Sequence, residues 1–310
     1  MTAVIETRGL GKDYGDVRAL DALDLTINRG EIFGLLGPNG AGKTTAISMM
    51  CGVRTPSRGT TEIAGIDIRA RPHEAKRKLG YAPQELALYE ELSAIENLSF
   101  FGSIYGLRGA DLGRAVTWAL EVAGLGGRGK DLVREYSGGM KRRLNLACAI
   151  LHQPEVLILD EPTVGVDPQS RSYLFDTIRR LTSERDMTVV YTSHYMEEVE
   201  ALCRRVAIID HGKLLAQDTV EALISGHGSG LDIDIDDACD ADAALAAASR
   251  SGTATLSGRR IHVEPAGKGL GEMITAIEAT GAHIRGLRTL EPSLETVFLT
   301  LTGHSLRDDP

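Results

Sequence analysis

The residues with the clearest chemical potential lie in one glycine-rich stretch, Gly37-Pro38-Asn39-Gly40-Ala41-Gly42-Lys43-Thr44. It matches the phosphate-binding pattern G-x-x-x-x-G-K-[ST] at every fixed position. A loop that wraps a phosphate chain must turn tightly and point backbone N–H groups inward, which glycines permit because they lack a Cβ. Lys43 would set its ammonium against the β and γ phosphates, and the Thr44 hydroxyl would complete the shell of a magnesium ion. The stretch therefore predicts a nucleotide triphosphatase.

Two carboxylates follow an apolar run farther along the chain. Residues 156–159 read as a central parallel strand, and Asp160 and Glu161 stand at its carboxyl end. In phosphate-loop enzymes such a strand supplies the magnesium-side aspartate, and Asp160 fits that role. Glu161 is suited to orient or deprotonate the attacking water. His194 follows another core strand, residues 187–192, where a structural role is the commoner one and a phosphate contact is the functional alternative.

A serine and two glycines, Ser137-Gly138-Gly139, precede a helix whose apolar positions include Met140 and Leu144. Ser137 is placed as the N-cap of that helix. One interpretation is a simple helix start after a glycine turn. The other is a second anion site, because a hydroxyl and two glycine N–H groups crown the helix N-terminus. The residues alone leave both open.

The elements that would hold these groups alternate between strand and helix. Residues 31–36 read as a buried strand that enters the glycine-rich loop, and residues 43–50 read as the helix that leaves it. Residues 3–6 and 23–28 alternate in polarity and suit an antiparallel sheet packed on one face. Residues 60–64 read as a further strand after the helix at 43–50.

Later segments complete this organisation. A helix is expected to end near Leu79, and Gln84 follows a short strand. Residues 93–150 have helical periodicity, with Ser93 as the N-cap and Glu96 completing a capping box. This stretch predicts an inserted helical subdomain.

Composition excludes several classes of protein. The 310 residues are 43% hydrophobic and 25% charged, which suits one large soluble domain plus a smaller one. The net charge of -9 argues against a nucleic-acid binder, which would present a basic face to phosphates. No apolar run approaches the roughly eighteen residues that span a bilayer, so a membrane role would come through a partner. The four cysteines are scattered along the chain: Cys51, Cys148, Cys203 and Cys239. We expect them to be small buried hydrophobic residues of a protein that works in a reducing compartment.

The pattern changes after residues 225–230, a glycine and serine stretch that predicts a domain boundary. Beyond it lie a strand from Leu231, a helix at 240–249, strand-like residues 253–264, a helix at 269–279, strand-like residues 283–288 and a last helix closed by Gly303. The apolar stripe of that last helix consists of Leu294, Val297, Phe298 and Leu301. This order predicts a small α+β domain.

Taken together, these motifs resemble the ATP-binding cassette (ABC) family over about residues 2–224. The glycine-rich loop, Gln84, Ser137-Gly138-Gly139, Asp160-Glu161, Asp167 and His194 fall in that family's order. The resemblance implies an α/β fold of the P-loop NTPase ABC cassette kind, with a mixed core sheet, an antiparallel β subdomain and an inserted helical subdomain. We therefore expect an ATPase domain at residues 1–224, with its helical part at about 93–150, and an accessory α+β domain at 231–310.

The resemblance also implies a role for each matching residue. Lys43, Glu161 and His194 resemble the catalytic set, in which Glu161 is the catalytic glutamate and His194 the switch histidine. Thr44, Gln84 and Asp160 resemble the magnesium ligands, and Gln84 also resembles the glutamine that links the metal to the permease. Contacts with ATP are implied for Tyr14, which resembles the aromatic residue that stacks on adenine, and for Gly37, Pro38, Asn39, Gly40, Ala41, Gly42, Lys43, Thr44, Thr45, Gln84, Ser137, Gly138, Gly139 and Asp167.

In the family's arrangement Ser137, Gly138 and Gly139 contact ATP held by a second copy of the chain, and Asp167 lies in the loop that crosses the dimer interface. The stretches 136–140 and 291–299 are similar to ATPase subunits of bacterial drug exporters of the daunorubicin-resistance type. We therefore expect a homodimer at the cytoplasmic face of the membrane, bound to a separate permease, that uses ATP and magnesium to drive efflux and binds no nucleic acid. The alternative is a soluble cassette ATPase of translation or DNA repair, which would usually carry two cassettes or a long coiled coil.

Overall fold

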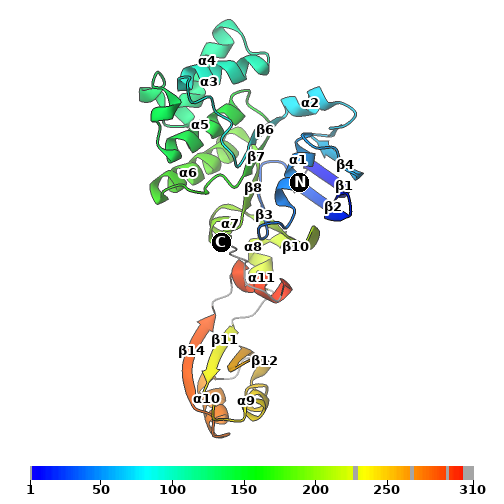
Figure 1. Ribbon diagram of the computed structural model, residues 1–310, viewed down its shortest axis with the longest axis vertical. Helices are drawn as coiled ribbons and strands as arrows, with labels where there is room; N and C mark the ends of the chain where they lie inside the picture. The colour runs from blue at the N-terminus through cyan, green and yellow to red at the C-terminus, as the bar shows by residue number, and fades with distance from the viewer. Residues whose placement is uncertain (1, 226–229, 266–268, 291–292, 303–310) are drawn as a thin grey trace. The chain divides into compact units, whose positions relative to one another are not determined.

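The structure is a computed structural model that describes residues 2–225, 230–265, 269–290 and 293–302 (Figure 1). The chain divides into two compact units, Met1–Val220 and Glu221–Ser305. Each unit contains a hydrophobic core of its own.

A six-stranded sheet forms the centre of the first unit, in the order β10-β9-β3-β8-β7-β6. All its neighbouring strands run parallel except β10, which is antiparallel to β9. Strands β3, β7 and β8 are buried at every position, because a parallel strand in such a sheet is covered on both faces. The strands are β3 (Ile32–Leu36), β6 (Leu79–Ala82), β7 (Val156–Asp160), β8 (Thr188–Ser193), β9 (Arg205–Asp210) and β10 (Lys213–Thr219).

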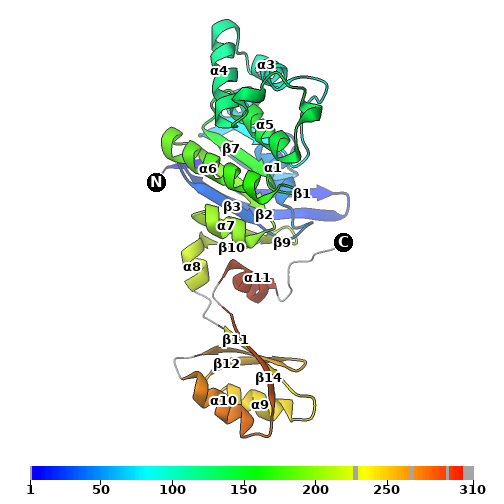
Figure 2. The same cartoon turned by 90° about the vertical axis from the view of Figure 1, so that its left-hand side faces the viewer.

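Helices follow several of these strands along the chain. α1 (Lys43–Met50) follows β3 at the glycine-rich loop, as predicted. α6 (Pro168–Arg185) and α7 (Met196–Leu202) pack on β8. Figure 2 shows both helices in front of the strands of this sheet. The short α2 (Pro72–Arg77) ends before Leu79, which begins β6 and is not part of a helix.

A second, antiparallel sheet in the first unit has the order β2-β1-β4-β5. Its strands are β1 (Ala3–Tyr14), β2 (Val17–Asn28), β4 (Arg58–Ile63) and β5 (Ile66–Asp67). β1 and β2 are longer than the alternating segments suggested, and Tyr14 is the last residue of β1. The reason is irregular pairing: register shifts between Thr7 and Lys12 interrupt the two-residue period on which the prediction depended.

The helical part of the first unit consists of α3 (Ala94–Ile104), α4 (Gly109–Val122) and α5 (Gly138–Ile150), with short 3-10 turns at Gly126–Arg128 and Val133–Glu135. α3 begins with the predicted capping box, in which the Ser93 side chain accepts from the Glu96 N–H and the Glu96 carboxylate accepts from the Ser93 N–H. The predicted apolar face of α5 joins a core shared by the three helices.

The second unit has the element order β11 (Gly230–Ile235), α9 (Ala241–Ala248), β12 (Gly252–Ser257), β13 (Arg260–Pro265), α10 (Leu270–Glu278), β14 (Ile284–Leu290) and α11 (Leu294–Thr302), preceded by α8 (Val220–Ser225). Its antiparallel sheet has the order β12-β13-β11-β14. A β-α-β-β-α-β succession with this order is the split βαβ, or ferredoxin-like, arrangement.

Residues 253–264 form two strands, although the sequence suggested one strand-like stretch. Gly258 has a positive φ of 61° and reverses the chain between β12 and β13. In α11, Leu294, Val297 and Phe298 are buried as predicted, whereas Leu301 is exposed. Gly303, the predicted end of this helix, lies outside the described residues.

Candidate functional site

The glycine-rich loop connects β3 to α1 and lines a cavity of about 250 Å³. Gly42 caps α1 with φ 103°, a backbone conformation that favours glycine. A Cβ on Gly42 would lie 2.7 Å from the Ala19 carbonyl oxygen, and a Cβ on Gly37 would overlap the Ile209 carbonyl. The residues that line the cavity are Ala19, Pro38, Asn39, Gly40, Ala41, Gly42, Lys43, Thr44, Thr45, Gln84 and Glu161.

Lys43 is the first residue of α1, and its ammonium is buried at the loop. Its Nζ donates to the carbonyl oxygens of Gly37 at 2.7 Å and Pro38 at 3.2 Å. The same Nζ lies 3.3 Å from Glu161 Oε1, and both side chains are no more than 7% exposed. Burial lowers the pKa of Lys43, and the Glu161 carboxylate opposes that shift. Glu161 thus pairs with the Lys43 ammonium at the place where a phosphate chain would bind it.

Asp160 ends β7, and Glu161 follows it with a positive φ of 46°. Thr192 on β8 fixes both residues, because its Oγ1 donates to Asp160 Oδ1 at 2.9 Å and accepts from the Glu161 N–H at 2.9 Å. Burial raises the pKa of Asp160, and the Thr192 hydrogen bond opposes that rise. Tyr81 OH on β6 donates to Asp160 Oδ2 at 3.5 Å. Neighbouring strand ends therefore place the two acids beside Lys43.

Glu161 is the point where four chain segments meet. Besides Lys43, its carboxylate accepts from Gln84 Nε2 at 3.4 Å. His194 Nδ1 lies 3.2 Å from Glu161 Oε2, although its geometry there is not that of a hydrogen bond. The structure thus brings together Lys43, Gln84, Asp160, Glu161 and His194. A buried acid beside a cation and a histidine can accept a proton from water.

The remaining predicted residues do not line this cavity. Tyr14 is 40% exposed at the end of β1, with Lys12 Nζ at 5.3 Å and the Arg54 guanidinium at 5.7 Å from its ring. Ser137 is the N-cap of α5, as predicted, and accepts from the Met140 N–H. Asp167 is the N-cap of α6 and accepts from the Ser170 N–H at 2.9 Å.

The N-termini of α5 and α6 face one another at Gly139. A Cβ on Gly139 would overlap the Ser170 side chain and lie 3.1 Å from Asp167 Oδ2, so only glycine fits the present spacing. Gly138 is less crowded, since a Cβ there would lie 3.9 Å from the Gly165 carbonyl oxygen. Ser137, Gly138, Gly139 and Asp167 thus form a second group, separate from the residues that line the loop cavity.

Sequence reasoning missed three residues that organise the site. Thr192 and Tyr81 hydrogen-bond Asp160, and Arg142 on α5 donates to the carbonyls of Gln84 and Val164. The position of Thr192 at the end of a core strand, two residues before His194, was the available signal. For Arg142 and Tyr81 the sequence offered none, because their partners lie on distant segments.

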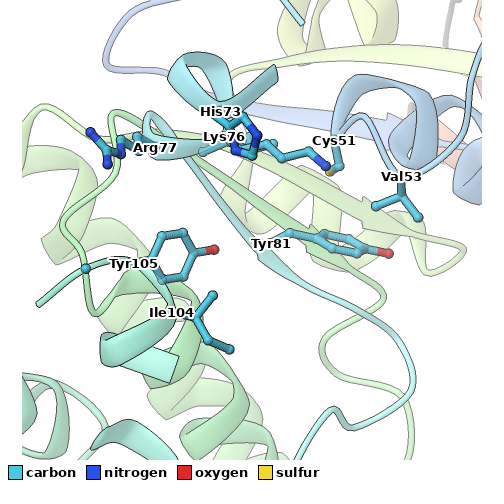
Figure 3. A pocket seen from close by; sticks show the side chains of 10 residues that line it. Cys51, Val53, His73, Lys76, Arg77, Tyr81, Ile104 and Tyr105 are labelled. Atoms are coloured by element: carbon cyan, nitrogen blue, oxygen red, sulfur yellow. The ribbon is translucent and has the colours of Figure 1, made fainter. Parts of the chain in front are cut away.

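A separate cavity of about 460 Å³ lies in the first unit and is lined by side chains from α2, β6 and the end of α3 (Figure 3). Tyr81 lines it and also contacts Asp160 through its hydroxyl. Ile104, which is 64% exposed, and Tyr105 form part of its apolar wall. This cavity is therefore connected to the acids of the loop site through one side chain.

Three general features of the described residues bear on the chemistry. No described helix is long and apolar enough to cross a membrane. Within the described ranges, no group of three or more histidine, cysteine or acidic side chains could hold a metal ion. Three of the four cysteines are buried as expected, whereas Cys239 is only half-buried.

Comparison with known proteins identifies the family. The ABC transporter family matches residues 20–164. The chain is 41% identical to the linearmycin resistance ATP-binding protein LnrL of Bacillus subtilis (strain 168), over 98% of this chain and 100% of that protein. It is 36% identical to the daunorubicin/doxorubicin resistance ATP-binding protein DrrA of Streptomyces peucetius, over 99% of this chain and 94% of that one.

A solved structure gives the same result. The ATP-binding subunit of an ABC transporter superposes with a TM-score of 0.65 at 29% identity, covering 72% of this chain and 92% of that chain. The expected α/β cassette fold and the resemblance to resistance ATPases are confirmed. The chain belongs to the ATP-binding subunits of the ABC transporter family and is an ATPase.

Proposed function

We propose that this ATPase powers the export of a drug-like or lipid-like compound through a separate membrane permease. The observation that carries the proposal is the similarity to LnrL and DrrA, both named as resistance proteins, which spans at least 98% of the chain and so includes the second unit. The expected location is the cytoplasmic face of the membrane, where the subunit binds its permease.

The geometry of the loop site supports a role for each side chain. The loop N–H groups and Lys43 bind the β and γ phosphates of ATP. Tyr14, which lies outside the loop cavity, stacks on adenine. Water attacks the γ-phosphorus, the bond to the β–γ bridging oxygen breaks, and Glu161 accepts the water proton. His194, which lies 3.2 Å from Glu161, contacts the γ-phosphate. ADP and inorganic phosphate are the products.

The oxygen donors near Lys43 fit a magnesium ion. The Thr44 side chain acts to lower the pKa of Asp160, and these two groups with the Gln84 amide oxygen are hard ligands of the kind that Mg²⁺ prefers. Few protein ligands are needed, because Mg²⁺ retains waters and binds substrate phosphates. When bound, the ion would neutralise charge on the β and γ phosphates.

The second group of residues supports a dimer. Ser137, Gly138, Gly139 and Asp167 lie outside the loop cavity, yet they place a hydroxyl and backbone N–H groups at a helix N-terminus, which suits an anion. We propose that two copies meet head to tail, so that these residues contact the ATP held by the partner's loop. ATP then joins the two copies until hydrolysis removes the bridging phosphate.

The proposal also assigns the permease a contact surface. The 460 Å³ cavity exposes apolar side chains and includes Tyr81, whose hydroxyl contacts Asp160. A permease segment bound there would touch a residue that contacts the magnesium-side aspartate. Gln84 is the residue expected to link the metal to the permease, and its Nε2 donates to Glu161 Oε2 at 3.4 Å.

The test combines biochemistry with transport. We expect Lys43→Ala to abolish hydrolysis and weaken ATP binding, whereas Lys130→Ala, at an exposed lysine, leaves both unchanged. Expressed together with a candidate permease subunit in a susceptible bacterium, the chain should raise tolerance of linearmycin or daunorubicin, and the Lys43→Ala variant should not. Equal drug accumulation with either variant, despite active ATPase, would contradict the export proposal.

A further inference from the structure

Glu198 on α7 is a buried acid that has no role in the site described so far. Its side chain is only 4% exposed, although glutamate is rarely buried in proteins without partners. Burying a carboxylate is costly unless hydrogen bonds satisfy its oxygens. The partners of Glu198 therefore indicate why an acid occupies this position.

One oxygen of Glu198 accepts hydrogen bonds from three hydroxyls. The donors to Oε2 are Thr163 Oγ1 at 2.7 Å, Tyr191 OH at 2.8 Å and Ser193 Oγ at 3.0 Å. Burial raises the pKa of the Tyr191 phenol, and the neighbouring Glu198 carboxylate raises it further, so the phenol stays protonated and donates. All three donors are buried, so water cannot replace a lost bond.

Two of these donors begin segments that carry proposed site residues. Ser193 directly precedes His194, and its Oγ also accepts from the Tyr195 N–H at 2.9 Å, which fixes the backbone on both sides of the histidine. Thr163 stands two residues after Glu161 and begins the Asp167 stretch, defined as residues 163–171.

The C-terminal end of the Asp167 stretch also contacts Glu198. Arg171 Nη1 lies 3.7 Å from Glu198 Oε1. Arg171 is in the first turn of α6, and its N–H donates to the Asp167 carbonyl at 3.0 Å. Thr163 and Arg171 thus connect both ends of the Asp167 stretch to one carboxylate. The same carboxylate also accepts from Ser193, which adjoins His194.

We propose that Glu198 is a positioning residue for ATP hydrolysis, which fixes the Asp167 stretch relative to His194. Asp167 is assigned to the partner's nucleotide and His194 to the chain's own, so their spacing determines whether both contacts form together. The inference rests on the site roles given under Proposed function. A shift of either segment breaks a buried hydrogen bond to Glu198, and loss of the carboxylate allows the two segments to move independently.

The test compares turnover with substrate affinity in the full 310-residue chain. Glu198→Gln keeps the shape of the side chain and removes the charge. We expect kcat to fall about tenfold while KM for ATP changes by less than about twofold, because Lys43 and its loop are unaffected. Amide hydrogen exchange should accelerate at both 163–171 and 193–195. The matched control is Glu197→Gln on the same helix, where the side chain is exposed, and it should leave kcat unchanged.

Thr163 provides a second test that does not disturb α7. Thr163→Val removes the hydroxyl at nearly constant volume, and Thr163→Ser retains it. We expect Val to lower kcat and Ser to preserve it, and Thr163→Val should add little to Glu198→Gln, because both break the same contact. If Glu198→Gln does not fold, this pair decides the question.

Two results would overturn the inference: wild-type kcat in Glu198→Gln or Thr163→Val, or a fall in kcat with exchange accelerated only within α7. Glu161→Gln, assayed alongside, tests the site itself. Retained turnover in that variant refutes the assignment of the hydrolytic residues. Full turnover in Glu198→Gln beside an inactive Glu161→Gln refutes only the positioning role.

Discussion

The ion pair between Lys43 and Glu161 predicts that Glu161→Gln binds ATP more tightly than the unmodified chain. In the structure the Lys43 ammonium is 3.3 Å from Glu161 Oε1, and both groups are buried. A phosphate chain that binds in the loop must compete with Glu161 for the Lys43 ammonium. The carboxylate also repels the incoming phosphates. The substitution removes the competing pair and the repulsion, so the nucleotide-free state loses stability relative to the bound state.

The magnitude follows from the distance. Two unit charges 3.3 Å apart attract by about 5 kcal/mol at an effective dielectric constant of about 20. Desolvation of the two buried groups offsets most of this attraction. Lys43 also keeps its bonds to the Gly37 and Pro38 carbonyls when the acid is absent. A net change of about 1.4 kcal/mol corresponds to a dissociation constant about tenfold lower.

Calorimetric titration with ATP in the presence of a metal chelator measures this affinity without turnover. Glu155→Gln is the matched control, because Glu155 pairs with Arg29 and Lys78 at 2.6 Å each and does not line the loop cavity. Its affinity for ATP should equal that of the unmodified chain. An equal or higher dissociation constant for Glu161→Gln would show that the ion pair does not compete with nucleotide, and the reasoning would fail.

Three further predictions concern stability and organisation. Gly139→Ala should lower the free energy of unfolding by about 1–3 kcal/mol, because the new Cβ would overlap Ser170. Gly138→Ala is the control and should lower it less, and denaturant titration compares the two variants. Burial lowers the pKa of His152 to about 4, below its value in the unfolded chain. The free energy of unfolding should therefore fall by about 3 kcal/mol as the pH drops from 6.5 to 4, because the unfolded chain binds the proton first. His152→Phe should remove that loss, as measured by thermal melting at a series of pH values. A chain truncated at Gly230 should remain soluble and bind ATP; aggregation would refute the proposed boundary.

The sequence predicted best those parts of the fold that depend on local patterns. The apolar run of β7, the capping box at Ser93 and the N-cap at Ser137 are confirmed because each depends on residues a few positions apart. The strand pair β1 and β2 was underestimated, since bulged pairing interrupts the alternation. The β12–β13 hairpin was missed although Gly258 marked the turn.

The candidate site could be predicted in its membership but not in its contacts. Strand ends placed Asp160, Glu161 and His194 near the loop, because parallel strands end at one edge. The contact of Glu161 with Lys43 and the three hydroxyls around Glu198 join segments that no sequence period relates. One signal for Glu198 was available: it lies four residues before Leu202, so the two share the buried side of α7.

The four-stranded sheet of the second unit ends on two open strands, β12 and β14, among the residues described for that unit. An open edge invites pairing with a foreign strand, and such pairing can continue into fibres. On β14 an exposed leucine, Leu287, stands between Arg285 and Arg288, which are exposed as well. Arg285 lies 3.6 Å from Asp237, and the charge of Arg288 on this edge opposes the approach of another copy of the strand. Replacing both arginines with valine would leave β14 without a charged side chain, and the consequence would be seen as insoluble protein during expression and not as lost ATPase activity.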